Sequence, residues 1–154
     1  MATERTLAIV KPDAMGRGLL GEVLCRIHKA GFQIVAIKSL CLTKAEAEGF
    51  YAVHRGKGFF ADLTEFMSSG KIVVMVLEAQ NSIARWRDTM GATDPAKAAA
   101  GTIRREFGTS IQNNCTHGSD APDTAAFEIT YFFSGQELTE QGVSRPYQSG
   151  SRRG

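Results

Sequence analysis

The chain has 154 residues, of which 43% are hydrophobic, and a formal net charge of +2. This length suits one ordinary domain with a real core, and the small charge gives no reason to expect an obligate nucleic-acid partner. The three cysteines are odd in number and lack Cys-x-x-Cys spacing, which argues against a disulfide framework and a zinc site. We expect a cytoplasmic protein without a membrane partner, because the sequence shows neither a signal-peptide pattern nor an apolar run of about 20 residues.

The hydrophobic pattern changes period several times along the chain. Continuous apolar runs indicate buried strands, and apolar residues at helical spacing indicate amphipathic helices. The run from Ile72 to Leu77 is the strongest strand, and its apolarity predicts a central position. Thr43 followed by Glu46 predicts the start of a capped helix. The predicted elements are a strand at 7–10, a helix at 18–31, a strand at 34–40, helices at 43–53 and 60–67, a strand at 72–77, a helix at 81–90, a long irregular connection at 92–113, a strand at 114–118 and a helix at 123–133.

The order of these elements predicts an α+β fold. Without the inserted helical pair, the order is β-α-β-β-α-β, which is that of a ferredoxin-like antiparallel sheet with four strands. We predict a single domain over residues 1–134, with a long loop before the last strand. After Gly135 the composition turns to Gly, Ser, Gln and Arg, so residues 135–154 are predicted to be a loosely ordered C-terminal tail.

A glycine-rich segment, Gly16-Arg17-Gly18-Leu19-Leu20-Gly21, matches the G-x-G-x-x-G pattern of dinucleotide-binding folds. The preceding strand ends about five residues too early, however, and no acidic residue follows the second strand to hold a ribose. A turn and a helix start account for the segment better. The sequence contains no G-x-x-x-x-G-K-[ST] motif, so a P-loop is excluded.

Of the three histidines, His117 has the neighbours best suited to chemistry. It ends a short β-like run and is followed by Gly118, Ser119 and Asp120. Glycine allows a close approach of the backbone to a ligand, and the hydroxyl and carboxylate could orient the imidazole or a bound group. These residues alone are equally compatible with a histidine in a loop or in the core.

Several cations lie where phosphate could bind. Lys11 directly follows a buried strand, although a solvated lysine would also fit there. Arg87 precedes Gly91 and Thr93, so that a guanidinium, a helix end and a hydroxyl converge. Helices also carry arginines on solvated faces, which is the alternative for the other arginines near the long connection, Arg85, Arg104 and Arg105.

The inserted helical pair contains a cluster of rings. One aromatic residue there could stack on a planar ligand, which binds without selecting a hydrogen-bonding edge, while another is expected in the core. The three histidines have no acidic residues at metal-binding spacing, so we expect no protein-held metal site. The rings are those of Tyr51, His54, Phe59 and Phe60.

Five segments occur in a fixed order: Val10-Lys11-Pro12-Asp13, Tyr51-x-x-His54-x-x-x-x-Phe59-Phe60, Arg87-x-x-x-Gly91-x-Thr93-Asp94-Pro95, Gly101-Thr102-Ile103-Arg104 and Asn114-x-x-His117-Gly118-Ser119-Asp120. Each alone would be a weak signal, but together they resemble the nucleoside diphosphate kinase family. The resemblance extends from about Thr3 to Phe133, and it implies the ferredoxin-like fold of that family.

The resemblance implies a ping-pong phosphotransferase. His117 would take the γ-phosphoryl group of a nucleoside triphosphate, typically ATP, and pass it from phosphohistidine to a nucleoside diphosphate. Glu128 would orient the ring, Ser119 would bond that glutamate or the transferring group, and Tyr51 would support Lys11 and the phosphoryl site. The catalytic residues implied are His117, Lys11, Glu128, Ser119, Tyr51 and Asn114.

The resemblance also implies how a nucleotide would bind. Phe59 would stack on the base with Leu63 and Ile111 nearby, and Lys11 with Asn114 would contact the sugar hydroxyls. Mg²⁺ would arrive with the nucleotide, held mainly by phosphates and water. The nucleotide-binding residues implied are Lys11, His54, Phe59, Leu63, Arg87, Thr93, Arg104, Ile111, Asn114 and Gly118.

Two features depart from the family pattern. Gly58 stands where the family usually has proline, and the tail beyond Phe133 does not match. The ending Tyr131-Phe132-Phe133 resembles bacterial members, so we expect a homo-oligomer, with a tetramer favoured and a hexamer or dimer as alternatives. Two other functions stay open, namely a non-catalytic ferredoxin-like module that binds nucleic acid or acts as a scaffold, and a histidine-phosphate relay to a protein.

Overall fold

The computed structural model describes residues 3–138. Its elements alternate between strands and helices, as the hydrophobic periods predict. They are, in chain order, β1 (Glu4–Val10), α1 (Pro12–Gly16), α2 (Leu20–Lys29), β2 (Gln33–Cys41), α3 (Lys44–Phe50), the 3₁₀ helix η1 (Ala52–His54), α4 (Phe60–Met67), β3 (Lys71–Ala79), α5 (Ser82–Met90), η2 (Pro95–Lys97), α6 (Ile103–Phe107), β4 (Thr116–Gly118), α7 (Pro122–Phe132) and η3 (Gly135–Leu138).

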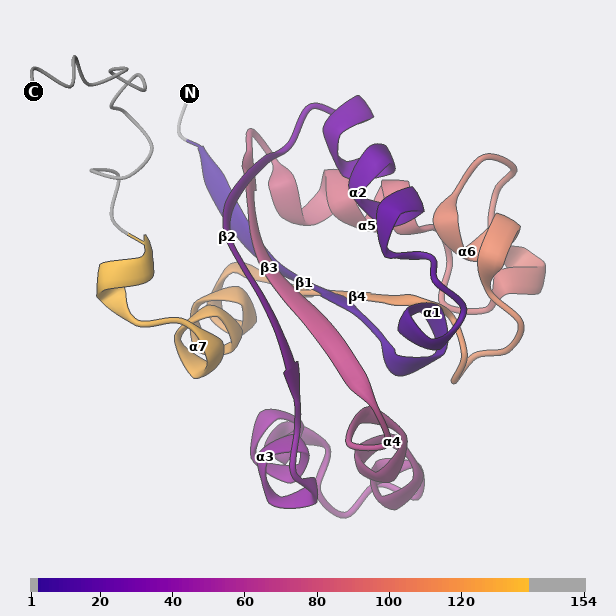
Figure 1. Ribbon diagram of the computed structural model, residues 1–154, viewed down its shortest axis with the longest axis vertical. Coiled ribbons are helices and arrows are strands. Elements are labelled where there is room, and N and C mark those ends of the chain that lie inside the picture. Colours follow the sequence, from indigo (N-terminus) through magenta and orange to yellow (C-terminus); the bar gives the residue numbers. More distant parts are fainter. Residues whose placement is uncertain (1–2, 139–154) are drawn as a thin grey trace, which may run out of the picture.

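The four strands form one antiparallel sheet in the order β2-β3-β1-β4 (Figure 1). This is the predicted ferredoxin-like topology, in which each β-α-β unit leaves room for one strand between its own two. The strongest predicted strand is β3, and it lies between β2 and β1 as its apolar sequence requires. The register places His117 of β4 opposite Ile9 of β1.

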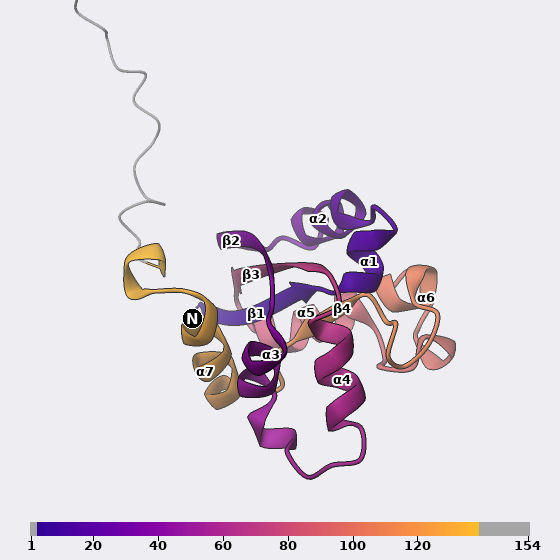
Figure 2. The same ribbon diagram turned by 60° about the horizontal axis from the view of Figure 1, so that its bottom comes forward.

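Each face of the sheet packs against its own set of helices. On one face, α2 and α5 contribute buried residues such as Ile27 and Trp86. On the other, α3, α4 and α7 contribute buried residues such as Phe50, Met67 and Ile129. Figure 2 shows α2 on one side of the sheet and α3, α4 and α7 on the other. The alternation of side chains along β1 and β3 supplies both cores, so every residue of β1 from Leu7 to Val10 is fully buried.

The local structure differs from the predictions in three segments. Pro12 does not only end β1 but also starts the short helix α1, because proline suits the first helical position, where no N–H donor is needed. Strand β4 begins at Thr116 rather than Asn114, since Cys115 has a left-handed backbone (φ 74°) that interrupts an extended run. The connection predicted to be irregular contains η2 and α6, the latter capped by the Thr102 hydroxyl.

The start of the predicted tail is part of the described structure. Residues 135–138 form η3, where Glu137 pairs with Lys38 of β2 at 3.1 Å and the carbonyl of Leu138 accepts from Arg5 at 3.1 Å. Residues 139–154 lie outside the described residues, so the proposed division between domain and tail stays a prediction. Within residues 3–138, no helix is long and apolar enough to cross a membrane.

Candidate active site

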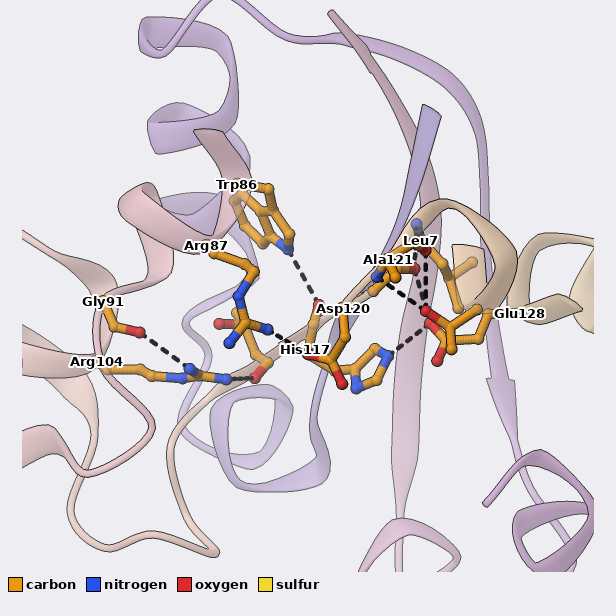
Figure 3. A network of polar contacts seen from close by, with 12 residues as sticks. Leu7, Trp86, Arg87, Gly91, Arg104, His117, Asp120, Ala121 and Glu128 are labelled. Atoms are coloured by element: carbon orange, nitrogen blue, oxygen red, sulfur yellow. Dashed lines mark hydrogen bonds and ion pairs between the residues drawn. The ribbon is translucent and has the colours of Figure 1, made fainter. Parts of the chain in front are cut away.

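His117 lies at the centre of β4, and a hydrogen bond to Glu128 of α7 orients its ring. Its Nε2 lies 2.9 Å from Oε1 of Glu128 on α7, and the Ser119 hydroxyl donates to the same oxygen at 2.8 Å (Figure 3). The backbone N–H of Leu7 donates to the Ser119 oxygen at 3.1 Å. Because a carboxylate only accepts, Nε2 carries the ring proton and Nδ1 keeps its lone pair. In Figure 3, this second ring nitrogen points away from Glu128.

Aromatic side chains hold the backbone and ring of His117. Phe50 and Tyr51 meet the imidazole edge to face, with ring centroids 5.5 and 6.2 Å away. On the other face of the sheet, the indole N–H of Trp86 donates to the His117 carbonyl at 3.1 Å. A β-carbon at Gly118 would lie 2.5 Å from Cδ1 of Trp86. The direction in which a side chain at position 118 would point is therefore filled by Trp86, so packing alone already requires glycine here.

The hydroxyl of Tyr51 is buried without a hydrogen-bond partner in the described part of the chain. Burial, and secondly the charge of Glu128, raises the pKa of Tyr51, so it remains a neutral phenol that can donate. The expected support of Lys11 is thus not a hydrogen bond from this hydroxyl. A buried hydroxyl near the ring of His117 is a donor that an incoming ligand oxygen could satisfy.

Lys11 is brought to β4 by the end of β1, where its backbone N–H donates to the Cys115 carbonyl at 2.8 Å. Its side chain is only 8% exposed, and its ammonium donates to Oδ1 of Asn114 at 2.8 Å. Asn114 in turn donates to the carbonyl of Thr93 at 3.1 Å. Burial, and secondly the charge of Arg104, lowers the pKa of Lys11 to about 8. A buried cation of this kind is stabilised by an anionic ligand.

Two arginines lie beside His117 but differ in their surroundings. Arg104 is 7% exposed and donates to the carbonyls of Gly91 and Thr116 at 3.0 and 2.8 Å. Burial, and secondly the charge of Arg87, lowers the pKa of Arg104 to about 10, so it stays charged at neutral pH. Arg87 projects from α5 and forms an ion pair with Asp120 (Figure 3). Three sequence-predicted cations, Lys11, Arg87 and Arg104, therefore converge on His117.

The candidate base-binding residues lie at an exposed end of the site. The Phe59 ring is 50% exposed and lies 5.4 Å from the His54 ring. The ammonium of Lys57 is 3.2 Å from Nδ1 of His54. Ile111 is 62% exposed, while Leu63 of α4 packs against the core. An exposed aromatic face such as that of Phe59 is what a stacking ligand requires.

Three other sequence candidates serve the fold. Arg85 donates to the Ala30 carbonyl and lies over the Phe32 ring at 5.1 Å, so it ties α5 to the end of α2. Arg105 donates to the Ala96 carbonyl at 3.0 Å within the long connection. Phe60 packs against the main core.

The structure also adds residues that sequence reasoning did not place. Phe50 and Trp86 pack around His117, and their only sequence signal is that each adjoins a predicted site residue. The carboxylate of Asp13 accepts from the backbone N–H of Cys115 at 3.1 Å and so holds the left-handed turn before β4. Asp120 was singled out as a partner of the histidine ring or a bound group, but its contact is with Arg87.

Comparisons with known proteins agree with this geometry. The nucleoside diphosphate kinase family model matches residues 4–138. The chain belongs to the nucleoside diphosphate kinase family. A nucleoside diphosphate kinase of Desulfotalea psychrophila is 60% identical over 135 residues, which is 88% of this chain and 98% of that protein. One from Syntrophotalea carbinolica is 61% identical over the same shares of both chains.

Solved structures lead to the same family. The Aquifex aeolicus nucleoside diphosphate kinase superposes with a TM-score of 0.87 at 48% identity, covering 90% of this chain and 100% of that one. A family protein from Babesia bovis gives a TM-score of 0.84 at 38% identity, covering 88% and 92%. The chain is thus a phosphotransferase that acts on nucleotides, and the resemblance noted in the sequence is confirmed.

Proposed function

We propose that this kinase carries the γ-phosphoryl group between nucleotides on Nδ1 of His117. The observation that carries the proposal is the contact of 2.9 Å between His117 Nε2 and Glu128, which leaves Nδ1 with its lone pair. The Ser119 hydroxyl bonds the same carboxylate oxygen and holds it in place. A ring oriented through one nitrogen and reactive at the other is the usual arrangement for a catalytic histidine.

In the first half-reaction, the lone pair of Nδ1 forms a bond to the γ-phosphorus of a nucleoside triphosphate. The bond from that phosphorus to the bridging oxygen breaks, and the leaving diphosphate takes the electron pair. The proton on Nε2 stays between the ring and Glu128, whose charge stabilises the cation that develops on the phosphorylated ring. A second nucleoside diphosphate then attacks the phosphohistidine through its terminal oxygen and reverses these changes.

The three cations supply the electrostatic part of the proposal. Lys11 and Arg104 are buried and already hydrogen-bonded, so their donors are fixed before a nucleotide arrives. Charges that need no reorganisation during the reaction are the most effective in stabilising a developing negative charge. Arg87, with the backbone around Thr93 and Gly118, completes the phosphate-binding surface that we propose.

We assign the base and the α-phosphate of the nucleotide to the exposed end of the site. Phe59 stacks on the base, with Leu63 and Ile111 beside it, and His54 lies near the α-phosphate. Lys11 and Asn114, which bond each other, hold the sugar hydroxyls. The exposure of Phe59 favours a broad choice of bases, because stacking on an aromatic face does not select the hydrogen-bonding edge of a base.

Members of this family use a divalent metal ion. Among residues 3–138, no group of three or more His, Cys, Asp and Glu side chains is placed to hold one. Asp120 and Glu128, the carboxylates beside His117, are already paired with Arg87 and the imidazole. This donor set fits an ion carried by the substrate, so we propose Mg²⁺ bound mainly to phosphates and water, where it neutralises phosphate charge.

We also propose a homo-oligomer in the cytoplasm, with a tetramer favoured. The supporting feature is β2, which lies at an edge of the sheet and exposes the apolar Ile37, 49% accessible. An edge strand offers unpaired backbone groups to another chain. Light scattering in solution gives the number of subunits directly, and a monomeric mass would contradict the proposal.

ATP labelled in its γ-phosphate tests the catalytic proposal. The wild-type protein should acquire acid-labile, base-stable phosphate and lose it when an unlabelled nucleoside diphosphate is added. His117→Gln should acquire none, whereas His28→Gln, on the distant helix α2, should label normally. Label that persists in His117→Gln would reject the assignment. Absence of any label would favour a non-catalytic module, and label that leaves only to a protein would favour a relay.

A further inference from the structure

The three cations around His117 have different partners in this structure. Lys11 and Arg104 are buried, and neutral oxygens accept their hydrogen bonds. Arg87 is different on both counts, because its side chain is 47% exposed and its partner is the carboxylate of Asp120. A neutral oxygen can keep its hydrogen bond while the cation also binds phosphate. A carboxylate competes with phosphate for the same guanidinium donors.

Asp120 is placed by the chain to act as such a competitor. It lies two residues after β4 ends, between Ser119 and the start of α7. Its side chain is 74% exposed, yet it lies close enough to Arg104 to favour that residue's charged form as well. The anion that faces this cationic cluster is therefore part of the protein itself. Guanidinium groups recognise carboxylate and phosphate oxygens with the same planar pairs of donors.

The arginine also has freedom to change partners. Its backbone is held firmly, because the neighbouring Trp86 is fully buried and bonds the His117 carbonyl. Its side chain instead borders a cavity of about 460 Å³, which Asp88, Asp120 and Pro122 also line. A half-exposed guanidinium that borders a cavity has room to turn between two anions without a movement of the main chain.

We propose that Asp120 is a positioning residue that holds Arg87 in the nucleotide-free enzyme and releases it to the phosphates when a nucleotide binds. This inference rests on the proposed function of the site. Asp120 acts as an internal competitor, so the pair weakens nucleotide binding and recaptures Arg87 as the product leaves. Exposed ion pairs are individually weak, so the competition should change affinity by about two- to fivefold.

The inference is tested by measuring ADP affinity in the presence of EDTA, by calorimetry or by the fluorescence of Trp86, the chain's single tryptophan. Removing the metal matters because a cation on the phosphates would itself respond to the charge of Asp120. Asp120→Asn should bind ADP about two- to fivefold more tightly than wild type. Asp120→Glu, which keeps the carboxylate, should stay close to wild type.

A double-mutant cycle separates the ion pair from a general charge effect. With Arg87→Gln as the background, Asp120→Asn should no longer tighten binding, because the arginine to be released is gone. An equal gain in both backgrounds would overturn the proposal. Asp88→Asn is the matched control, since it removes the same charge from the same cavity and should change affinity little. A gain as large as that of Asp120→Asn would also overturn it.

The binding measurement contains no chemical step, so it is independent of phosphohistidine formation. If the cycle shows coupling but His117 is never labelled by ATP, the proposed reaction fails while the pairing stands. If His117 is labelled and the cycle shows no coupling, only the role of Asp120 fails. Unchanged thermal unfolding of all five variants, the double variant included, confirms that each reports on binding and not on folding.

Discussion

The phosphate end and the base end of this site are built in opposite ways. At the phosphate end, Lys11, Arg104 and Asn114 are all less than a tenth exposed. At the base end, Phe59 is 50% and Ile111 62% exposed. A buried cation interacts strongly with a developing charge because little water screens it. A stacking surface needs only an exposed face, and it accepts any base.

The difference indicates where the fold gives up stability for function. Burying Lys11 disfavours its charged form, as its lowered pKa of about 8 shows. The hydrogen bond to Asn114 offsets part of that cost, and bound phosphates would offset the remainder. Exposing Phe59 and Ile111 leaves apolar area unburied but removes no charged group from water. The reaction therefore depends on the buried end, and tolerance towards substrates depends on the exposed end.

The largest expected effect comes from removing the buried charge. Lys11→Met should slow phosphorylation of His117 by ATP about 10²–10³-fold, as loss of one preorganised donor does elsewhere. Methionine adds no polar group of its own, and Oδ1 of Asn114 loses the donor that Lys11 supplied. Single-turnover rapid quench with saturating ATP measures the rate, and Lys29→Met on the exposed end of α2 is the control. A near-normal rate for Lys11→Met would contradict the conclusion that the reaction depends on the buried end of the site.

The second-largest effect is expected from loss of the contact to the sugar hydroxyl. If Lys11 and Asn114 position the 3′-hydroxyl against the leaving oxygen, nucleotides without it should phosphorylate His117 about ten- to a hundredfold more slowly. Their affinity should fall less, because a bond that strengthens in the transition state acts on the rate. Pre-steady-state rates with both substrates, on wild type and Asn114→Ala, test this. The gap between substrates should shrink in the variant, and a normal maximal rate with the 3′-deoxy nucleotide would contradict the proposed role.

The lowered pKa of Lys11 predicts a pH dependence that the base end lacks. Below about pH 8 the ammonium is present in the free enzyme, and above it the proton is lost. A bound phosphate favours the charged form, so ADP affinity should fall as pH rises through 8, by up to about tenfold per unit. Calorimetry between about pH 7 and 9.5 measures it. Lys11→Arg, which stays charged, should be flat over this range, and the same decline in that variant would assign the effect to another group.

At the exposed end we expect an effect on binding and not on the reaction rate. Phe59→Ala should weaken purine and pyrimidine diphosphates alike by about 1–3 kcal/mol, nearer the lower value because the ring is half exposed. Binding of ADP, GDP and CDP to both proteins measures it, with the phosphorylation rate at saturation expected to change little. A loss confined to one base would show that this end reads base edges and is more selective than its exposure indicates.

Much of the fold was predictable because its periodicities are strong. The run that became β3 is continuously apolar, so it could only be buried on both faces. The capping box of Thr43 and Glu46 formed as predicted, since its hydrogen bonds are local. The missed pieces, α1 and α6, have five residues each, too few to show a hydrophobic period. The left-handed Cys115 was also missed, because a non-glycine residue carries no local sign of that conformation.

For the site, the sequence by itself determined which residues were candidates. His117, Lys11 and Arg87 stand near strand and helix ends that the hydrophobic pattern marks, whereas Arg104 lies in the connection predicted to be irregular and was identified by the resemblance. Only the tertiary structure decided their partners and their burial. The hydrogen bond between Lys11 and Asn114 joins residues that are 103 positions apart in the sequence. The ion pair between Arg87 and Asp120 joins residues that are 33 positions apart. Hydrophobic periods specify each element from its own residues, whereas the dielectric around a charge depends on which distant elements the sheet brings together.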